Sequence, residues 1–83
     1  MELTSETIDG ITVIQISGRL EAANKDKLKA AVDDCLAETQ VNFLIELDGL
    51  DFIDSSGLGC LVACLRRADQ AGGTLKITGL KNY

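Results

Sequence analysis

The chain contains no histidine, no proline and no tryptophan among its 83 residues. The absence of histidine excludes Ser-His-Asp triads, Cys-His dyads, HExxH zinc sites and other mechanisms that need an imidazole acid or base. Because only one Tyr and two Phe are present, aliphatic side chains must fill the core. Without proline, glycine residues mark the boundaries between the short elements that the sequence predicts.

The chain has three cysteines, and it lacks the paired spacing of a disulfide scaffold or a zinc site. Cys35, Cys60 and Cys64 form an odd set without a CxxC pair, which disfavours both a disulfide framework and a zinc site. Each lies among apolar neighbours in a helical pattern. We therefore expect reduced, buried thiols, no bound metal and a reducing compartment.

Long hydrophobic runs are also missing. The longest charge-free and mainly apolar stretch, residues 55–65, is far shorter than the ~18 residues of a membrane helix. The N-terminus has neither a basic region nor an apolar signal core. These features lead us to expect a soluble, cytoplasmic protein without direct membrane insertion.

The charge balance and the glycine motifs exclude further classes of function. Eight basic and thirteen acidic residues give a net charge of −5, which disfavours binding to nucleic acid. No P-loop motif is present, and Val62 stands where a dinucleotide fingerprint beginning at Gly57 would need its third glycine. The sequence therefore predicts no cofactor and no enzymatic activity.

The hydrophobic periodicity predicts an α/β fold with the order β-β-α-β-α-β. An Asp9-Gly10 turn joins the first two strands, and we expect Gly18 to end the second, Asn24 to cap the first helix through its side chain, and Gly72-Gly73 to end the second helix. The expected strands are residues 3–8, 11–17, 41–47 and 74–78. The helical stripes are Leu28, Ala31, Val32, Cys35 and Leu36, then Leu58, Leu61, Val62, Leu65 and Ala68.

A hairpin followed by two crossover units should give a mixed, largely parallel sheet. Residues 41–47 are apolar on both faces, which is typical of a central strand covered on both sides. Two helices can cover only one face well, so we expect the other face of the sheet to lack a cover within this chain.

The candidate functional residues lie in one segment, the predicted loop between the third strand and the second helix. We expect Ser55 to cap that helix, where a phosphate on its hydroxyl would lie at the positive end of the helix dipole. Asp48, Asp51 and Asp54 crowd the same loop and would steer a basic partner protein. Residues 54–57 (DSSG) also suit a turn followed by a helix cap, so a purely structural interpretation stays open.

Residues 50–59 (LDFIDSSGLG), after the strand at residues 42–47 (NFLIEL), resemble the signature of the STAS domain family, named after sulphate transporters and anti-sigma factor antagonists. Residues 18–24 (GRLEAAN) resemble the family's G-x-L-D motif before the first helix. Residues 72–77 (GGTLKI) resemble its Gly-Gly turn and following strand. The resemblance covers essentially the whole chain and points to the bacterial anti-sigma factor antagonist branch.

The resemblance implies a protein-binding switch rather than an enzyme. Antagonists of this family bind an anti-sigma factor that is also an ATP-dependent serine kinase, and this binding frees a sigma factor. The kinase phosphorylates the first serine after the Asp, here Ser55, and a metal-dependent serine phosphatase reverses the modification. The partner-binding residues that we predict are Glu21, Asp51, Asp54, Ser56 and Gly57.

The matching positions also imply individual roles. Asp54 resembles the residue that orients the serine hydroxyl in the kinase complex, and Ser56 is the supporting hydroxyl or cap. Glu21 stands where the family usually has Asp. Two alternatives stay open: a STAS subunit that docks on a membrane transporter or signalling assembly without being phosphorylated, and a scaffold whose loop serine is only a cap.

The family usually continues beyond its Gly-Gly strand with another strand and further helices. Here residues 79–83 (GLKNY) stand where the next helix would begin. We therefore expect a single STAS domain over residues 1–83 that is short at its C-terminus. Open strand edges and an uncovered apolar face should favour a homo-oligomer.

Overall fold

The computed structural model describes residues 1–80, and these form six elements in the predicted order. The elements are β1 (Glu2–Ile8), β2 (Ile11–Leu20), α1 (Lys25–Ala37), β3 (Asn42–Ile53), α2 (Ser55–Gln70) and β4 (Thr74–Thr78). The predicted α/β fold is therefore confirmed. Residues 81–83, on which the expected shortening of the domain partly depends, lie outside the described residues. Self-association stays a prediction, which sedimentation at several concentrations would test.

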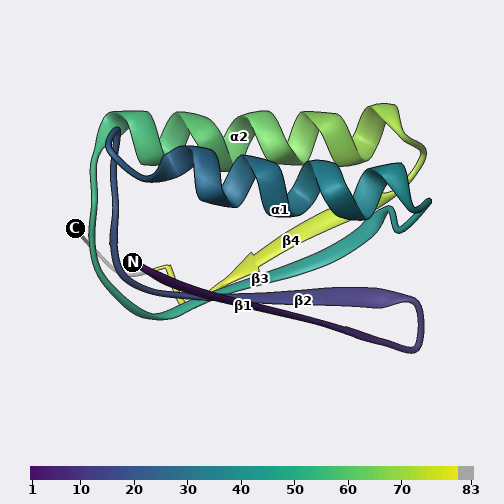
Figure 1. The fold of residues 1–83 in the computed structure, drawn as a ribbon, viewed down its shortest axis with the longest axis horizontal. Coiled ribbons are helices and arrows are strands. Elements are labelled where there is room, and N and C mark those ends of the chain that lie inside the picture. Colours follow the sequence, from purple (N-terminus) through teal and green to yellow (C-terminus); the bar gives the residue numbers. More distant parts are fainter. Residues whose placement is uncertain (81–83) are drawn as a thin grey trace.

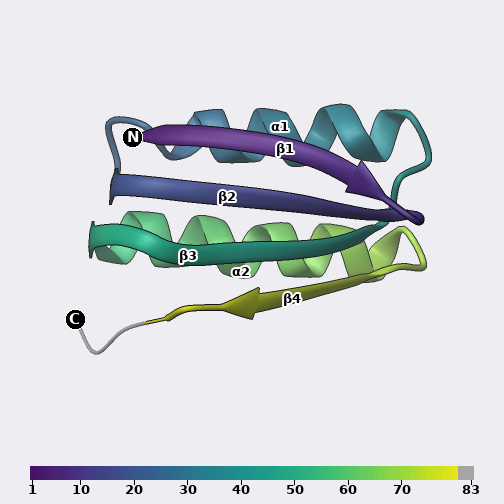
Figure 2. The same cartoon turned by 90° about the horizontal axis from the view of Figure 1, so that it is seen from below.

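The four strands form one mixed sheet in the order β1-β2-β3-β4. β1 pairs with β2 antiparallel, whereas β2 with β3 and β3 with β4 are parallel. Both helices pack on the same side of this sheet, side by side, and begin at the same end of the molecule (Figure 1). The view from below shows the strands in front of the helices, and neither α1 nor α2 lies over the other face (Figure 2). The expectation of one uncovered face is confirmed.

The hairpin between β1 and β2 follows its predicted turn chemistry. Asp9 and Gly10 both have positive φ angles, 50° and 81°, as a type I′ turn requires. Beside the turn, the buried Thr12 hydroxyl lies within hydrogen-bond distance of Thr7 (3.1 Å) and Gln40 (3.2 Å). This polar cluster joins the hairpin to the segment before β3, so the buried hydroxyl does not lose its hydrogen bonds.

The core lies between the sheet and the helices. Alternate residues of the central strands point into it and are at most 2% exposed: Ile14, Ile16, Phe43, Ile45 and Leu47. Leu28 and Val32 of α1 meet them from the helix layer. The prediction that both faces of residues 41–47 are covered is wrong, because Asn42, Leu44 and Glu46 are only half-buried. Their face of β3 has no helix above it.

The buried stripe of α2 differs from the prediction. Leu61 and Ala68 are buried as expected, but Leu58, Val62 and Leu65 are 49%, 45% and 43% exposed. The remaining buried positions of α2 are Gly57, Cys60 and Cys64. These small side chains let the helix approach the sheet and α1 closely, so the bulkier aliphatic stripe faces outward. Arg67 of α2 forms an ion pair with Asp33 of α1, their atoms 2.6 Å apart.

The second and third strands run further than predicted. Gly18 does not end β2; it adopts a φ of 85° within the strand, which continues to Leu20. β3 continues to Ile53, because pairing with β2 persists through two register shifts. Bulges of this kind accommodate extra residues without ending the ladder. Most of the predicted loop at residues 48–54 is therefore strand.

Candidate functional site

The candidate site lies where β2 and β3 end and both helices begin. Because the two strands are parallel, their carboxyl ends meet at one end of the sheet, and the chain passes there into α1 and α2 (Figure 1). Ligands and partners of open α/β sheets commonly meet this end. Two segments form the site: residues 21–24 before α1, and residues 54–57 at the start of α2.

Asp54 is the residue that joins these two segments. Its Oδ1 accepts the backbone N–H of Gly57 at 2.7 Å, and its Oδ2 accepts the backbone N–H of Ala22 at 3.1 Å. Its own N–H donates to the carbonyl of Leu20 at 3.2 Å. The carboxylate thus caps α2 and also holds the segment that leads into α1.

These contacts favour the charged form of the carboxylate. The N–H of Gly57 contributes most to lowering the pKa of Asp54 below its ordinary 3.8, the N–H groups of Ala22 and Ser56 add to it, and desolvation opposes it. The cap of α2 is therefore Asp54 and not Ser55, which corrects the prediction. A carboxylate in this place suits the positive end of the helix better than a hydroxyl does.

Ser55 is the first residue of α2 and is exposed. Within residues 1–80 its hydroxyl makes no hydrogen bond, since the capping role is taken by Asp54. Ser56, next to it, is half-buried. Of the two adjacent serines, Ser55 is thus the more accessible to another protein.

Gly57 has a packing role that explains why no side chain stands there. It is buried, and an added Cβ would lie 2.5 Å from the carbonyl oxygen of Leu20. The absence of a side chain lets the first turn of α2 approach the end of β2. Its role as a partner contact stays a prediction.

The segment before α1 is held by Asn24, though not as predicted. The Asn24 Oδ1 accepts the N–H of Glu21 at 3.0 Å, and its Nδ2 donates to the carbonyl of Arg19 at 2.8 Å. Asn24 occupies the cap position but makes no side-chain hydrogen bond to the helix. Its amide closes a local turn instead, because both of its polar atoms find partners upstream.

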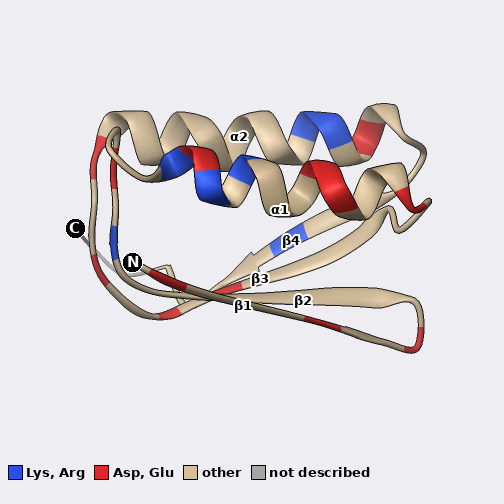
Figure 3. Cartoon of the chain, in the orientation of Figure 1, with Lys and Arg blue, Asp and Glu red and all other residues tan. Residues whose placement is uncertain are grey.

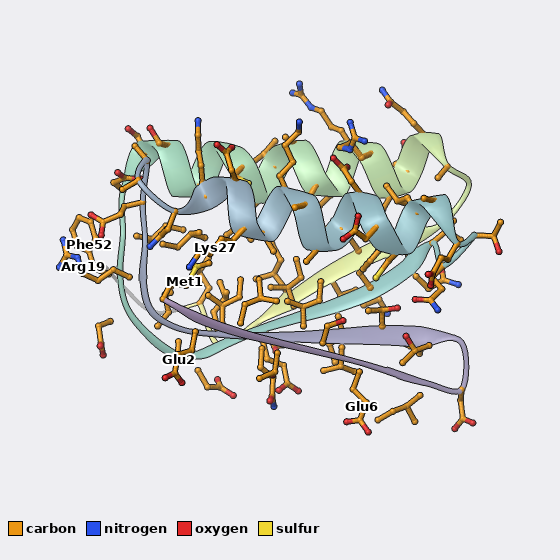
Figure 4. The ribbon with its side chains drawn as sticks, viewed as in Figure 1. Met1, Glu2, Glu6, Arg19, Lys27 and Phe52 are labelled. Carbon is orange, nitrogen blue, oxygen red and sulfur yellow. The ribbon has the colours of Figure 1, made fainter. Side chains whose placement is uncertain are left out.

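A cluster of Arg19, Glu21 and Phe52 flanks the site. The Arg19 Nε lies 3.1 Å from Glu21 Oε2, and the guanidinium carbon is 4.0 Å from the centroid of the Phe52 ring. Arg19 and Phe52 lie together at this end of the molecule (Figure 4). Sequence reasoning missed this contact, since only the pairing of β2 with β3 brings the two residues together.

The three aspartates do not share one loop as predicted. Asp48 and Asp51 belong to β3, and only Asp54 lies between strand and helix. Asp51 is exposed, and the register between β2 and β3 skips it, since Gly18 pairs with Leu50 and Arg19 pairs with Phe52. Acidic residues still gather along the strands at this end, whereas Lys and Arg lie mainly on the helices (Figure 3).

The outward stripe of α2 extends the site away from Ser55. Leu58 and Val62 lie about one and two turns further along the helix, and with Ser55 and Arg66 they line a shallow hollow of about 670 Å³. Lys29 of α1 borders the same hollow. The helical periodicity predicted this stripe, but as part of the core and not as an exposed surface.

Other kinds of site find no support in the described part of the chain. Among residues 1–80, no group of three or more His, Cys, Asp or Glu side chains is placed to hold a metal ion. Neither α1 nor α2 is long and apolar enough to span a lipid bilayer.

The chain is similar to known proteins in sequence and in fold. The anti-sigma F factor antagonist of Paenibacillus polymyxa is 26% identical over 78 residues, which cover 93% of this chain and 67% of that protein. The unphosphorylated form of the anti-sigma factor antagonist SpoIIAA superposes with a TM-score of 0.84 at 18% identity, covering 98% of this chain and 76% of that one. The phosphorylated form of the Bacillus cell fate determinant SpoIIAA gives 0.76 at 20% identity, covering 89% and 68%. The STAS domain family matches residues 2–83, and the chain therefore belongs to that family.

Proposed function

We propose that this protein is an anti-sigma factor antagonist controlled by phosphorylation of Ser55. In its unphosphorylated form it binds an anti-sigma factor that is also a serine kinase, and this binding frees a sigma factor. Phosphate on Ser55 releases the partner, and a serine phosphatase restores the binding form. The similarity to two named anti-sigma factor antagonists supports the antagonist role.

The observation that carries the proposal is the division of roles between Asp54 and Ser55. Asp54 supplies the cap of α2 through its bond to Gly57, which leaves the exposed Ser55 hydroxyl without a structural task among the described residues. A phosphate can be added there without breaking a hydrogen bond of the fold. The switch therefore needs no unfolding of the helix.

The partner surface that we propose centres on Ser55. Asp51 supplies negative charge on the strand side, Glu21 contributes its ion pair with Arg19, and the exposed Leu58 and Val62 supply apolar contact area on the helix side. Exposed aliphatic side chains beside a polar rim are typical of protein interfaces. Asp54 and Gly57 shape this surface from beneath, and Ser56 borders it.

Release follows from electrostatics. A phosphate adds roughly −1.5 to −2 charges at neutral pH, next to the ionised Asp54 and near the apolar Leu58. The partner must then desolvate a dianion and accommodate its volume, and it meets more negative charge. A loss of about 3 kcal/mol weakens binding by more than about 100-fold. In this role the protein acts by binding and carries out no reaction itself.

The test compares Ser55→Ala and Ser55→Asp with the matched variant Ser56→Ala. The partner is an anti-sigma factor kinase from the same organism, and binding is measured by titration calorimetry before and after incubation with ATP. We expect Ser55→Ala to bind and to resist release, and Ser55→Asp to bind more weakly. Mass spectrometry should find the phosphate on Ser55 in the natural sequence and in Ser56→Ala.

Phosphate on Ser56 alone, or release of Ser55→Ala by ATP, would contradict the assignment. Equal affinity of Ser55→Ala and Ser55→Asp would contradict the idea that negative charge at residue 55 weakens partner binding. Binding that no phosphorylation changes would favour the alternative, a STAS subunit that docks in a larger assembly without modification. Because Asp54 caps the helix, Ser55→Ala should leave the melting temperature nearly unchanged.

A further inference from the structure

The face of the sheet that neither α1 nor α2 covers has hollows and a residue composition of its own. This side of the sheet is the open face. It carries a hollow of about 530 Å³, lined by side chains that include Glu6, Ile8, Val13, Gln15 and Glu46. Glu2 and Glu6 project from β1 on the side away from the helices (Figure 4). The open face is thus a separate surface from the stripe of α2 that begins at Ser55.

One corner of the open face is apolar and exposed. Ile8 and Ile11 face each other across the hairpin and are 51% and 46% exposed. Val13 and Leu44 pair in the next row across β2 and β3, and both are only half-buried. These four aliphatic side chains lie in neighbouring rows of one sheet, which makes them a continuous patch rather than scattered surface residues.

The patch is bordered by acidic residues, one of which is held in place by a hydrogen bond. Glu6 lies opposite Val13 in the register. Glu46 is held by the Gln15 amide, which donates to its Oε2 at 2.8 Å. Glu2 and Glu46 also line a second hollow, of about 330 Å³, further along the strands. Against these acids the open face offers one base, Lys76, within the described residues.

The charge distribution differs between the two layers. The helices mix both signs, with bases at Lys25, Lys27, Lys29, Arg66 and Arg67, whereas acidic residues dominate the strands (Figure 3). A symmetric contact between two open faces would bring Glu6 and Glu46 of both copies together, which like-charge repulsion opposes. Anionic lipid and nucleic acid are disfavoured for the same reason.

We propose that the open face is a second docking surface, which binds a basic segment of a partner protein through aliphatic anchors. The anchors would pack on Ile11, Val13 and Leu44, and Lys or Arg side chains would reach Glu6 and Glu46. This surface works independently of Ser55, because the helix layer and the core separate it from the outward stripe of α2. The protein could then hold two partners at once.

The test uses the whole chain and a short amphipathic peptide of Leu and Lys as the probe, with a Leu and Glu peptide as its control. The variant Glu6→Gln/Glu46→Gln removes two charges from the open face. Its matched control, Asp26→Asn/Asp34→Asn, removes two exposed charges from α1. Ile11→Thr and Val62→Thr form a second pair, since their parent side chains are 46% and 45% exposed on opposite layers.

We expect the basic peptide to shift amide resonances of β1 to β4 in the natural sequence, and the acidic peptide to shift none. Glu6→Gln/Glu46→Gln should weaken binding about tenfold, and raising NaCl from about 50 to about 300 mM should weaken it further. Ile11→Thr should weaken binding, whereas Val62→Thr and the α1 variant should bind normally.

Equal losses in the two charge variants would reveal unspecific attraction and overturn the proposal. Shifts confined to α1 and α2 would overturn it as well, and this result does not depend on whether any variant folds. A dimer that buries the open face, seen by sedimentation and abolished by Ile11→Thr, would replace the partner by a second copy. None of these results depends on the phosphorylation of Ser55.

Discussion

The carboxylate of Asp54 accepts the backbone N–H of Ala22 at 3.1 Å, although the two residues are 32 positions apart. The same carboxylate caps α2 through Gly57. One side chain therefore sets the position of the segment before α1 relative to the start of α2. The proposed phosphorylation site and the Glu21 side of the proposed partner surface share this support.

The pH dependence of stability should report this bond. Because the pKa of Asp54 is lowered in the folded protein, its stabilising effect is present above the ordinary value of 3.8 and is lost as the pH falls through the lowered value. Melting temperatures from neutral to acid pH would measure this. In Asp54→Asn, which keeps a capping amide without the charge, the acid-dependent loss should be smaller. An unchanged pH profile would contradict the role of the charge.

Two glycines of α2 should respond to alanine in opposite directions. At Gly57 a Cβ would approach the Leu20 carbonyl oxygen to 2.5 Å, whereas at Gly59 it would meet nothing within 4 Å. We expect Gly57→Ala to lower the free energy of unfolding by about 1–3 kcal/mol and Gly59→Ala to raise it by about 0.5–1 kcal/mol. Urea unfolding of the pair checks this, and equal effects would show that the close approach to β2 relaxes easily.

Thr39 after α1 should be a site for stabilisation. Its φ of 63° places a β-branched residue in the left-handed region, which favours glycine or asparagine. Thr39→Asn should raise the free energy of unfolding by about 0.5–1 kcal/mol. Thr39→Ala keeps the unfavourable Cβ contact and is the control. If Thr39→Ala raised the free energy of unfolding as much as Thr39→Asn, the left-handed φ of residue 39 would not be the cause.

The three thiols should differ in reactivity. Desolvation and the neighbouring Cys60 raise the pKa of Cys64 to about 12, so very little of the reactive thiolate forms at pH 8. Cys60 is also buried, whereas Cys35 is half-buried. Iodoacetamide under native conditions should modify Cys35 first and Cys64 last, as read by mass spectrometry. Rapid labelling of Cys64 without denaturant would contradict the packing of α2.

Much of the fold could be predicted from local sequence. The Asp9-Gly10 turn and the six elements follow from short-range chemistry, since turn residues, β-branched runs and helical spacing act within a few positions. The resemblance of residues 50–59 to the STAS signature added the family, which the comparison over residues 2–83 confirms.

Only the tertiary structure decided which surfaces these elements present. α2 carries two possible stripes, and the one with Gly57, Cys60 and Cys64 is buried because small side chains allow close packing on the sheet. β3 continues to Ile53 because β2 lies beside it and bulges absorb the extra residues. The hydrogen bond between Asp54 and Ala22, the contact of Arg19 with Phe52 and the acidic open face depend on residues far apart in the chain. Local preferences cannot specify them, because each arises only when separate strands and helices are brought together.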